Sequence, residues 1–527
     1  MEPGRSPRHA REGCAVSAHV GRTAAIALWG LAGTPVQIEA SVNSGLPGID
    51  IVGLPDTSVS ESRKRIRAAI SNLGITLPAQ RITVNLSPGS VKKVGTAFDL
   101  GIATAILAAA GHLPTGAGAG LVFVGELGLD GRLHPVRGVM PCALAAVRAG
   151  FGGCAVPAAN SAEARLVPGL KVLGAGNLAE ALNALGGQVA VPALPPVSSP
   201  PSAAASRPAT GDLREVRGHG DARRALEVAA AGGHHLLMIG SPGAGKTLLA
   251  GCLPSLLPRL SDVEAVEALA LRSIDGTLDA AAAEPERQPP FEAPHHRTSA
   301  AAMVGGSRPG TIGVFSRAHR GVLFMDEAPE FHRDVLEALR QPLESGRCDI
   351  HRAWGSVSLP ARFQLVLAAN PCPCGASMGP QGACSCSPMD RRRYRGRLSG
   401  PLLDRVDIQL DMLPIAPADL HSGQPSEDSA SVARRVARAR ERQAERFAGQ
   451  SWALNAQAPG SWLRESFALS RAQTQPLDRA LERGSLTMRG YDRIVRIAAT
   501  IADLDDRSAP DGDDLLAALV LRTREAA

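Results

Sequence analysis

Short apolar runs, each followed by glycine or a polar residue, recur through the second half of the chain, and helical patterns lie between them. Apolar runs of this length predict buried strands, and their alternation with helices is typical of an open parallel sheet. Residues 212–415 are therefore predicted to form an α/β domain. Its predicted strands are His235–Ile239, Val322–Met325, Phe363–Ala369 and Val406–Leu410.

Residues 19–187 mix strand and helix patterns in a different order. Ile82–Leu86 and Leu121–Gly125 predict short strands, the second followed by a turn at Gly131. Ser58–Asn72 predicts an amphipathic helix, and its basic residues are typical of a solvated helix face. We therefore predict an α+β domain here.

Composition separates these regions. Residues 188–211 contain six prolines and a single charged residue, Arg207. Such a segment cannot bury a core, so it is predicted to be a semi-extended linker. Residues 1–18, rich in Gly, Pro and Arg, are predicted to be disordered. Residues 425–527 are mostly helical in pattern and charged, and they predict a separate small helical domain.

The chain of 527 residues is too long for one hydrophobic core, and about two to four domains are expected. Its net charge of +6 and pI near 9.0 suit a nucleic-acid partner without requiring one. An aromatic content of 3% argues against a single-strand binder that relies on base stacking. Because it has neither a run of about eighteen apolar residues nor a signal-peptide pattern, we expect a cytoplasmic protein without a membrane partner. Its nine cysteines should then stay reduced.

The most specific motif follows the first predicted strand of the α/β domain. Residues 240–247 read GSPGAGKT, a complete phosphate loop between a strand and a helix. Backbone N–H groups and the helix N-terminus cradle phosphates in such a loop, the lysine reaches the β- and γ-phosphates, and the threonine ligates Mg²⁺. The alternative is a glycine-rich turn without a ligand. The predicted cofactors are ATP and Mg²⁺, and the predicted binding residues are Gly240, Ser241, Pro242, Gly243, Ala244, Gly245, Lys246 and Thr247.

Two further strands end in residues suited to ATP hydrolysis. Asp326 and Glu327 follow the second predicted strand, about eighty residues after the phosphate loop, as in a Walker B motif. Asp326 would hold Mg²⁺ through water, and Glu327 would polarise the attacking water. Asn370 follows the third strand, where it can sense the γ-phosphate. It can also begin a turn before Pro371, and the two roles are compatible.

Two arginines are candidates for contact with the transferring phosphate. Arg405 lies at the start of the fourth predicted strand, and as an arginine finger it would act across a subunit boundary. Arg489 lies at the start of a long predicted helix near the C-terminus. For each of them a surface salt bridge is the alternative, and sequence spacing does not decide between the two.

Four of the nine cysteines form C-x-C…C-x-C over fifteen residues, 372–386, just after Asn370. In a reducing compartment such a cluster more often binds metal than forms disulfides, and Zn²⁺ accepts four thiolates tetrahedrally. A redox-labile or merely exposed cysteine loop is the alternative. The predicted zinc ligands are Cys372, Cys374, Cys384 and Cys386.

Basic residues gather in two segments, one just after the cysteines and one in the predicted helical domain. Arg391–Arg397 holds five arginines in seven residues, which fits contact with a phosphate backbone, or pairing with carboxylates or a neighbouring subunit's nucleotide. Arg434–Arg446 is interleaved with glutamates and is typical of a solvated helix face. Before Asn370, Arg347–Leu359 predicts two short strands with Arg352 and Trp354 near their turn. Hairpin packing and DNA contact both remain open for these two side chains.

These motifs resemble the YifB/ComM family of magnesium-chelatase-like AAA+ ATPases, from about residue 19 to the end. APHH and NPCPCG together are specific to it. The resemblance implies a AAA+ P-loop ATPase, with a parallel sheet covered by helices on both faces and a helical lid, preceded by an α+β Lon-protease-like domain. The matching stretches are SGLPGIDIVGLPDTSVSESRKRIRAAI, RITVNLSPG, GSPGAGKT, APHHRTSAAAMVGG, GVLFMDEAPEF, ARFQLVLAANPCPCG, GPLLDRVD and MRGYDRIVRIAATIADL.

The resemblance also implies a role for each candidate residue. The hairpin at 347–359 corresponds to the presensor hairpin, which points into the pore of ring translocases, and Gly305–Gly310 is shorter than the family's glycine-rich insert. The implied roles are Walker A for Lys246 and Thr247, Walker B for Asp326 and Glu327, sensor 1 for Asn370, arginine finger for Arg405 and sensor 2 for Arg489.

The Lon-like domain lacks the residues for proteolysis. In Lon-like proteases the nucleophilic serine follows a Lys-x-Gly-x stretch, and a lysine lies on the next helix. Here the stretch is Lys93–Asp99, with Ala97 at the serine position and Cys142 at the lysine position. If the alignment slips by one residue, Thr96 is the only hydroxyl and the lysine is still missing. We therefore expect a non-proteolytic scaffold that serves DNA binding or ring assembly.

For the whole chain the resemblance implies an ATP-driven DNA motor. It would be a homo-oligomer, a hexameric ring, and a helicase that promotes branch migration on branched or single-stranded DNA in homologous recombination and natural transformation. The alternative is a magnesium-chelatase-like ATPase that remodels a protein partner. The Lon-like domain and the cysteine loop argue against this alternative, because the chelatase subunit lacks both. The missing dyad argues against an ATP-dependent protease.

Overall fold

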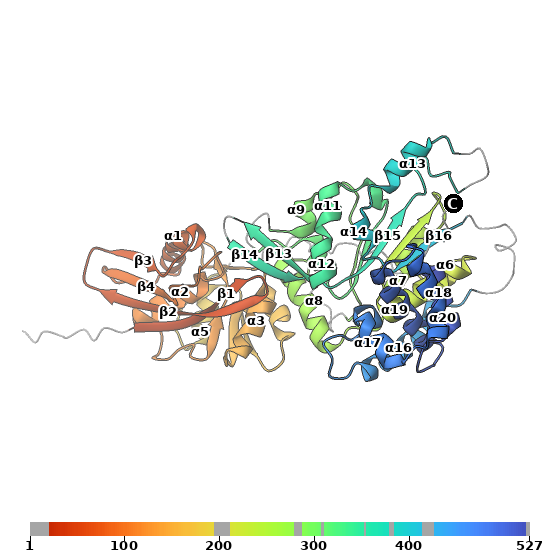
Figure 1. Cartoon of the computed structure of the whole chain (residues 1–527). Coiled ribbons are helices and arrows are strands. Elements are labelled where there is room, and N and C mark those ends of the chain that lie inside the picture. The colour runs from red at the N-terminus through yellow and green to blue at the C-terminus, as the bar shows by residue number, and fades with distance from the viewer. Residues whose placement is uncertain are drawn as a thin grey trace, which may run out of the picture. The chain divides into compact units, whose positions relative to one another are not determined.

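The computed structural model describes residues 20–193, 211–278, 287–306, 310–352, 355–378, 384–413 and 426–522. The chain divides into two compact units, one ending at Pro200 and the other beginning at Pro201 (Figure 1). The predicted disordered segment 1–18 and most of the predicted linker 188–211 lie outside the described residues.

The first unit contains a seven-stranded mixed sheet of strand order β3-β4-β2-β1-β5-β8-β9. β1 pairs antiparallel with β2 over its whole length, and β5, β8 and β9 continue the sheet in parallel. The strands are β1 (Val20–Trp29), β2 (Ala32–Asn43), β3 (Gly48–Val52), β4 (Arg81–Ser87), β5 (Leu121–Phe123), β8 (Gly153–Pro157) and β9 (Lys171–Ala175), with a separate ribbon of β6 (Glu126–Leu127) and β7 (Leu133–His134).

Alternating burial in β4 shows how the sheet acquires its core. Ile82, Val84 and Leu86 are buried and their neighbours are not, as a side-chain period of two requires. α2 lies against β1 and β2 and is buried along almost its whole length, because its sequence is apolar on every side. The helices of this unit are α1 (Thr57–Asn72), α2 (Asp99–Ala109), α3 (Val139–Arg148), α4 (Ser161–Arg165) and α5 (Leu178–Ala184).

The second unit is built on a five-stranded sheet of order β11-β12-β15-β10-β16, in which every pairing is parallel. This confirms the predicted parallel α/β architecture. The strands are β10 (Leu236–Gly240), β11 (Phe291–Glu292), β12 (Val322–Met325), β15 (Gln364–Ala369) and β16 (Ile408–Met412). β16 begins two residues later than predicted, because the N–H groups of Arg405 and Val406 bond back to Leu402 and Leu403 in a turn.

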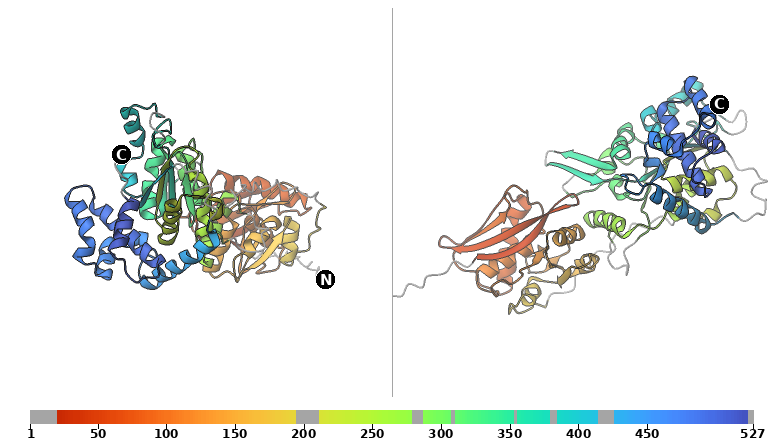
Figure 2. Two further views of the ribbon diagram at one scale, coloured as in Figure 1. Left: turned by 90° about the vertical axis from the view of Figure 1, so that its right-hand side faces the viewer. Right: turned by 60° about the horizontal axis from the view of Figure 1, so that its bottom comes forward.

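Helices and one hairpin surround this sheet. The hairpin of β13 (Arg347–Arg352) and β14 (Gly355–Pro360) projects from the unit (Figure 2). Its turn, with Trp354, lies outside the described residues. The helices are α6 (Gly220–Gly232), α7 (Lys246–Leu256), α8 (Asp262–Asp275), α9 (Ala300–Val304), α10 (Val314–Arg317), α11 (Arg333–Ala338), α12 (Arg340–Ser345), α13 (Pro388–Arg395) and α14 (Gly400–Leu403).

The C-terminal helices join the same compact unit. One hydrophobic core contains Phe324 of the sheet, Val436 of α16 and Ile494 of α19, and α16 and α19 both pack on α6. The helical segment therefore shares its core with the sheet. Its helices are α16 (Ser429–Arg446), α17 (Gly460–Phe467), α18 (Arg471–Glu482), α19 (Met488–Leu504) and α20 (Gly512–Arg522).

The arginines of α16 do not all lie on a solvated face as predicted. Arg434 and Arg438 are exposed. Arg435, however, pairs with the buried Glu227 at 2.6 Å, and Arg440 donates to the carbonyl of Ala230 at 2.6 Å. These two guanidinium groups anchor α16 on α6, since backbone carbonyls and a buried carboxylate there need donors.

Candidate nucleotide-binding site and four-cysteine loop

The phosphate loop joins β10 to α7, as its motif predicts. Gly243 and Gly245 have φ near +80°, a conformation that other residues rarely adopt. A Cβ on Gly240 would lie 2.7 Å from the carbonyl oxygen of Met412, so no side chain fits there. Ala244 is buried and its N–H bonds to the carbonyl of Ser241. The local sequence therefore folds this loop around a hollow, and the N-terminus of α7 points into that hollow.

Lys246 lies inside this hollow. Its Nζ donates to the carbonyls of Gly240 at 2.6 Å and Ser241 at 3.0 Å, and to Oδ1 of Asn370 at 3.2 Å. Burial lowers the pKa of Lys246, while the charges of Asp326 and Glu327 oppose that shift. The predicted Walker A and sensor 1 residues are therefore in direct contact.

Asp326 and Thr247 supply adjacent oxygens. Thr247 Oγ1 donates to Asp326 Oδ2 at 2.7 Å, and the N–H of Glu327 donates to Asp326 Oδ1 at 2.9 Å. A hydroxyl and a carboxylate beside a phosphate loop fit the oxygen ligands that Mg²⁺ prefers. These two residues would hold the ion, which would then neutralise charge on the bound phosphates.

The carboxylate of Glu327 faces a histidine that we did not assign from the sequence. Glu327 is the second residue after β12 and adopts φ +50°, and its Oε2 lies 3.2 Å from His296 Nδ1. His296 belongs to the loop after β11, the neighbouring strand. The family-specific APHH stretch was the available signal for this residue, but no spacing in the sequence pairs it with Glu327.

Arg405 lies at the opposite edge of the sheet from the phosphate loop. Ile408 pairs with Leu236, at the start of β10, and Met412 pairs with Gly240, at its end. Five strand residues span about 13 Å, and Arg405 precedes Ile408 by three more. Its guanidinium contacts Glu344 of α12 and donates to the carbonyl of Pro401 at 2.5 Å. Arg405 therefore cannot reach the phosphates bound by its own loop.

Arg489 lies near Arg405 and is also remote from the phosphate loop. It is 77% exposed and lies 3.9 Å from Asp404, beside Arg405 in the chain. One turn later on α19, Arg493 pairs with the buried Asp407 and donates to the carbonyl of Arg405 at 3.3 Å. Although burial opposes ionisation of Asp407, the adjacent His234 and Arg493 hold its pKa well below its usual range. This ion pair fixes the segment that carries Arg405 to α19.

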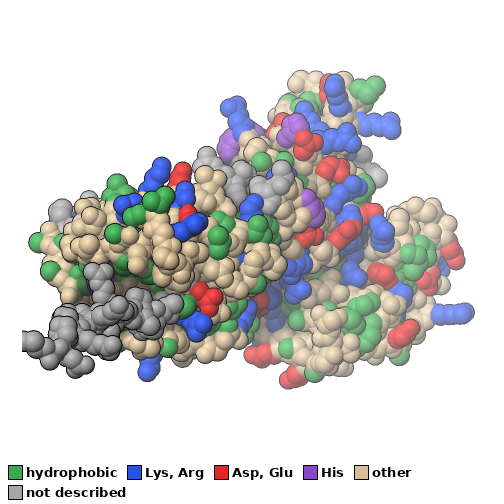
Figure 3. Space-filling model, turned by 90° about the vertical axis from the view of Figure 1, so that its left-hand side faces the viewer, with side chains coloured by type: hydrophobic (Ala, Val, Ile, Leu, Met, Phe, Trp, Pro, Cys, Tyr) green, Lys and Arg blue, Asp and Glu red, His purple; other side chains and the backbone are tan. Residues whose placement is uncertain are grey.

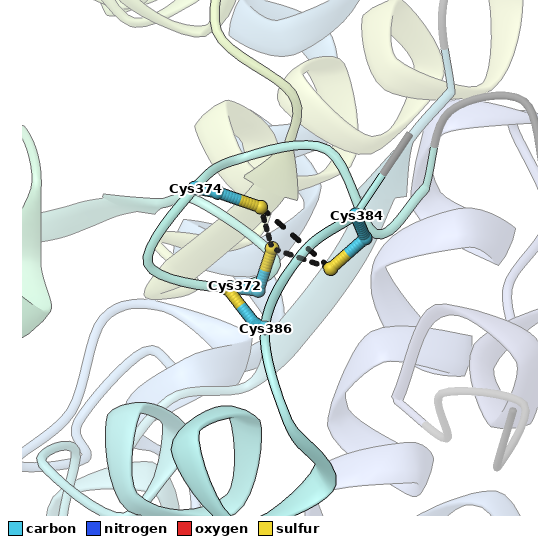
Figure 4. A group of neighbouring side chains, drawn as sticks. All are labelled: Cys372, Cys374, Cys384 and Cys386. Atoms are coloured by element: carbon cyan, nitrogen blue, oxygen red, sulfur yellow. Dashed lines mark hydrogen bonds between the residues drawn. The ribbon is translucent and has the colours of Figure 1, made fainter. Parts of the chain in front are cut away.

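The four predicted zinc ligands converge from two ends of one loop (Figure 4). Cys372 Sγ lies 3.3 Å from that of Cys374 and 3.7 Å from that of Cys384, and all four sulfurs lie within 4.8 Å of one another. Tetrahedral zinc with Zn–S bonds of about 2.3 Å needs sulfurs about 3.8 Å apart. A hydrogen bond from the Ala376 N–H, with the neighbouring thiols, lowers the pKa of Cys374 to about 6 and favours its thiolate. The arrangement is consistent with a structural zinc.

The cysteine loop lies against the phosphate loop. A Cβ on Gly375, at φ +77°, would come within 2.6 Å of the Pro242 ring. Only glycine therefore lets the Cys-Pro-Cys-Gly turn approach the nucleotide site this closely.

We predict about one zinc per chain in protein purified without chelators, measured by elemental analysis. The double variant Cys372→Ser/Cys384→Ser should lose it, because two of four thiolates are removed. Cys252→Ala, which changes a buried cysteine of α7, should keep the metal. Wild-type protein without any bound metal would refute the site.

The arginines after the cysteine loop lie on and just beyond α13. Its N-terminus is fixed by a capping box between Ser387 and Asp390. Arg392, Arg393 and Arg395 are exposed, and Figure 3 shows Lys and Arg side chains at the top of the second unit, the end where α13 lies in Figure 1. On the inner face Tyr394 is buried, and burial raises its pKa to about 12, opposed by a hydrogen bond with the backbone of Asn370.

Arg397, by contrast, forms an ion pair within its own chain. It pairs with Glu330 at 2.8 Å, three residues after Glu327. On the hairpin, Arg352 is exposed and bonds only locally, to the carbonyl of His351 at 3.3 Å.

In the first unit, the two positions of a Lon-type dyad belong to an apolar cluster. Ala97 packs against the cluster that contains Cys142, and burial raises the pKa of that thiol above its usual range. Thr96 hydrogen-bonds to Glu126, and Lys93 is fully buried, with its Nζ donating to the carbonyl of Gly53 at 2.9 Å. None of these groups pairs a nucleophile with a lysine base.

The phosphate loop, the Walker B pair and Asn370 meet at the carboxyl edge of a parallel sheet, which defines a P-loop ATPase of the AAA type. Three protein-family descriptions match the chain: "Magnesium chelatase, subunit ChlI" over residues 212–420, "Subunit ChlI of Mg-chelatase" over 38–160 and "Magnesium chelatase, subunit ChlI C-terminal" over 426–522.

Full-length relatives agree. An uncharacterized protein of Mycobacterium tuberculosis is 46% identical over 508 residues, 95% of this chain and 98% of the relative. YifB of Escherichia coli is 41% identical over 479 residues (90% and 92%), and "Competence protein ComM" of Haemophilus influenzae is 41% identical over 471 (89% and 91%). A Lon protease of Mycolicibacterium smegmatis is 30% identical over 168 residues, 31% of this chain.

This chain belongs to the YifB/ComM family of magnesium-chelatase-like ATPases. In the described part of the chain, no helix has the length and apolar character needed to cross a bilayer.

Proposed function

We propose that this ATPase is a ring-forming DNA motor, a helicase that promotes branch migration during homologous recombination or natural transformation. The observation that carries the proposal is the position of α13. Its outer face presents Arg392, Arg393 and Arg395, and its inner residue Tyr394 contacts the backbone of Asn370 in the nucleotide site. Such a helix can contact a phosphate backbone and respond to the bound nucleotide. The relative named as a competence protein adds support.

The ring is supported by the location of Arg405 and Arg489. Both lie away from the phosphate loop of their own chain, so they can contact ATP only in a neighbouring copy. A closed ring gives every subunit such a neighbour, and a hexamer is the form we propose.

A magnesium-chelatase-like ATPase that remodels a protein partner is the second candidate. It is favoured by the family descriptions, and the match at residues 38–160 is itself described as ChlI. The first unit, which the sequence analysis counts against this candidate, is therefore compatible with it. The cysteine loop and the exposed arginines of α13 still favour DNA.

The two candidates differ in their response to DNA. We predict that branched DNA raises the ATPase rate and that binding weakens steeply with salt, because each phosphate contact releases a counterion. Removing one contact, as in Arg392→Ala, Arg393→Ala or Arg352→Ala, should reduce the log–log salt slope by about one unit. Fluorescence anisotropy over a salt series and a coupled ATPase assay measure both effects.

Arg434→Ala and Arg438→Ala are the controls, since these exposed arginines of α16 lie outside the proposed DNA surface. In these two variants the log–log salt slope should stay within about half a unit of the wild-type slope. If branched DNA neither binds nor changes the ATPase rate at low salt, the protein-remodelling candidate replaces the DNA motor.

A further inference from the structure

Three arginines near the amino edge of the sheet are each paired with a carboxylate of their own chain. Arg405 contacts Glu344, Arg489 lies 3.9 Å from Asp404, and Arg340 pairs with Glu337 at 2.7 Å. The first two are the arginines to which the family resemblance gives roles. The third lies on α12, and the family resemblance implies no role for it.

Helix geometry places Arg340 beside Arg405. Arg340 and Glu344 are four residues apart on α12, so their side chains share one face of the helix. Glu344 contacts Arg405, and Arg340 therefore lies one turn away on the side that faces Arg405. Burial lowers the pKa of Arg405, and the positive charges of Arg340, Arg489 and Arg493 lower it further, in agreement with a cluster of cations.

The cluster retains unused hydrogen-bonding capacity. The Nε atoms of Arg340 and Arg405 are buried and have no hydrogen-bond partner within the part of the chain that the structure describes. Buried donors are normally satisfied, and guanidinium groups side by side repel each other unless an anion lies between them. The carboxylates of Glu337 and Glu344 are 34% and 61% exposed, so water can take over their interactions when a more highly charged anion approaches the arginines.

We propose that Arg340 is a third phosphate-binding arginine, which acts with Arg405 and Arg489 on the triphosphate held by the neighbouring subunit. The three carboxylates hold these side chains in the isolated chain and release them when a neighbour presents its nucleotide. Arginine suits this site because its planar fork can bind two phosphate oxygens at once. This inference rests on the proposed ring.

The test compares Arg340→Ala, Arg340→Lys and the control Arg333→Ala, an exposed arginine of the preceding helix α11. We expect Arg340→Ala to lower the ATPase rate by about ten- to a hundredfold, with unchanged affinity for ATP at its own intact phosphate loop. Arg340→Lys keeps the charge without the fork and should recover only part of the rate. Arg333→Ala should match wild type. Circular dichroism checks that each variant is folded.

Mixing experiments distinguish a direct contact between Arg340 and phosphate from a purely structural role of Arg340 in α12. Arg340→Ala mixed with Lys246→Ala should regain activity, because some interfaces then combine an intact phosphate loop with an intact Arg340. Arg405→Ala is mixed with Lys246→Ala in parallel. If only the Arg405→Ala mixture recovers, or if Arg340→Ala alone hydrolyses ATP within about twofold of wild type, the role of Arg340 is refuted and the ring stands. If neither mixture recovers although mixed oligomers form, the ring proposal fails as well. Should Arg340→Ala not fold, Arg340→Lys takes its place in the same mixtures.

Discussion

Replacing Lys246 with alanine is expected to reduce ATP hydrolysis to background. Lys246 is the buried cation in the hollow of the phosphate loop, and its Nζ lies within hydrogen-bonding distance of the Gly240 carbonyl and Asn370. The carbonyls of Gly240 and Ser241 and the side-chain oxygen of Asn370 converge on this one ammonium group. Removing one such charge contact from a transition state costs a factor of about 10²–10³ or more.

The measurement is phosphate release at saturating ATP, with Lys171→Ala, an exposed lysine at the start of β9, as the control. Lys171→Ala should match wild type. Hydrolysis by Lys246→Ala within about tenfold of wild type would mean that the loop does not carry out the reaction.

Glu327→Gln tests the residue that would polarise the attacking water in the same site. The amide keeps the size of the side chain and loses the negative charge that polarises water, so the variant should bind ATP and hydrolyse it slowly. Because the neighbour's nucleotide would persist, assembled oligomers should accumulate with ATP, as seen by analytical ultracentrifugation. Wild-type rates in Glu327→Gln would show that the Walker B assignment is wrong.

Arg405→Ala is expected to lose ATP hydrolysis by roughly 10³-fold or more while it still binds ATP, since this is the usual contribution of an arginine finger. The sheet register carries this expectation: Arg405 precedes β16 at the edge opposite to the phosphate loop, so it can act only in trans. ATP affinity, measured with a fluorescent analogue, should remain within about twofold of wild type.

Complementation decides whether the effect is in trans. Arg405→Ala and Lys246→Ala are each inactive alone, but a mixed interface can join the intact phosphate loop of the first to the intact arginine of the second. Equal mixtures should therefore recover part of the wild-type rate. Mixed oligomers that form and remain inactive would show that Arg405 does not act across the interface and has a structural role instead.

The sequence by itself determined the phosphate loop, the Walker B pair and the position of Asn370. Each of these depends on a strand, the turn after it and the residue types at that turn, all of which are local. The parallel sheet followed as well, because strands that alternate with helices usually pair in parallel. The four cysteines were also predictable as one group, since a single short loop carries them.

Only the tertiary structure decided which distant residues meet. The pairing of His296 with Glu327, the approach of Gly375 to Pro242 and the inward arginines of α16 join segments tens or hundreds of residues apart. The separation of Arg405 from its own phosphate loop depends on the order and register of the strands. These cannot be read from local patterns in a single sequence. Local patterns determine which elements form, whereas packing of their buried faces determines which side chains meet. In this ATPase, that packing places Arg340, Arg405 and Arg489 at the edge of the sheet away from the phosphate loop.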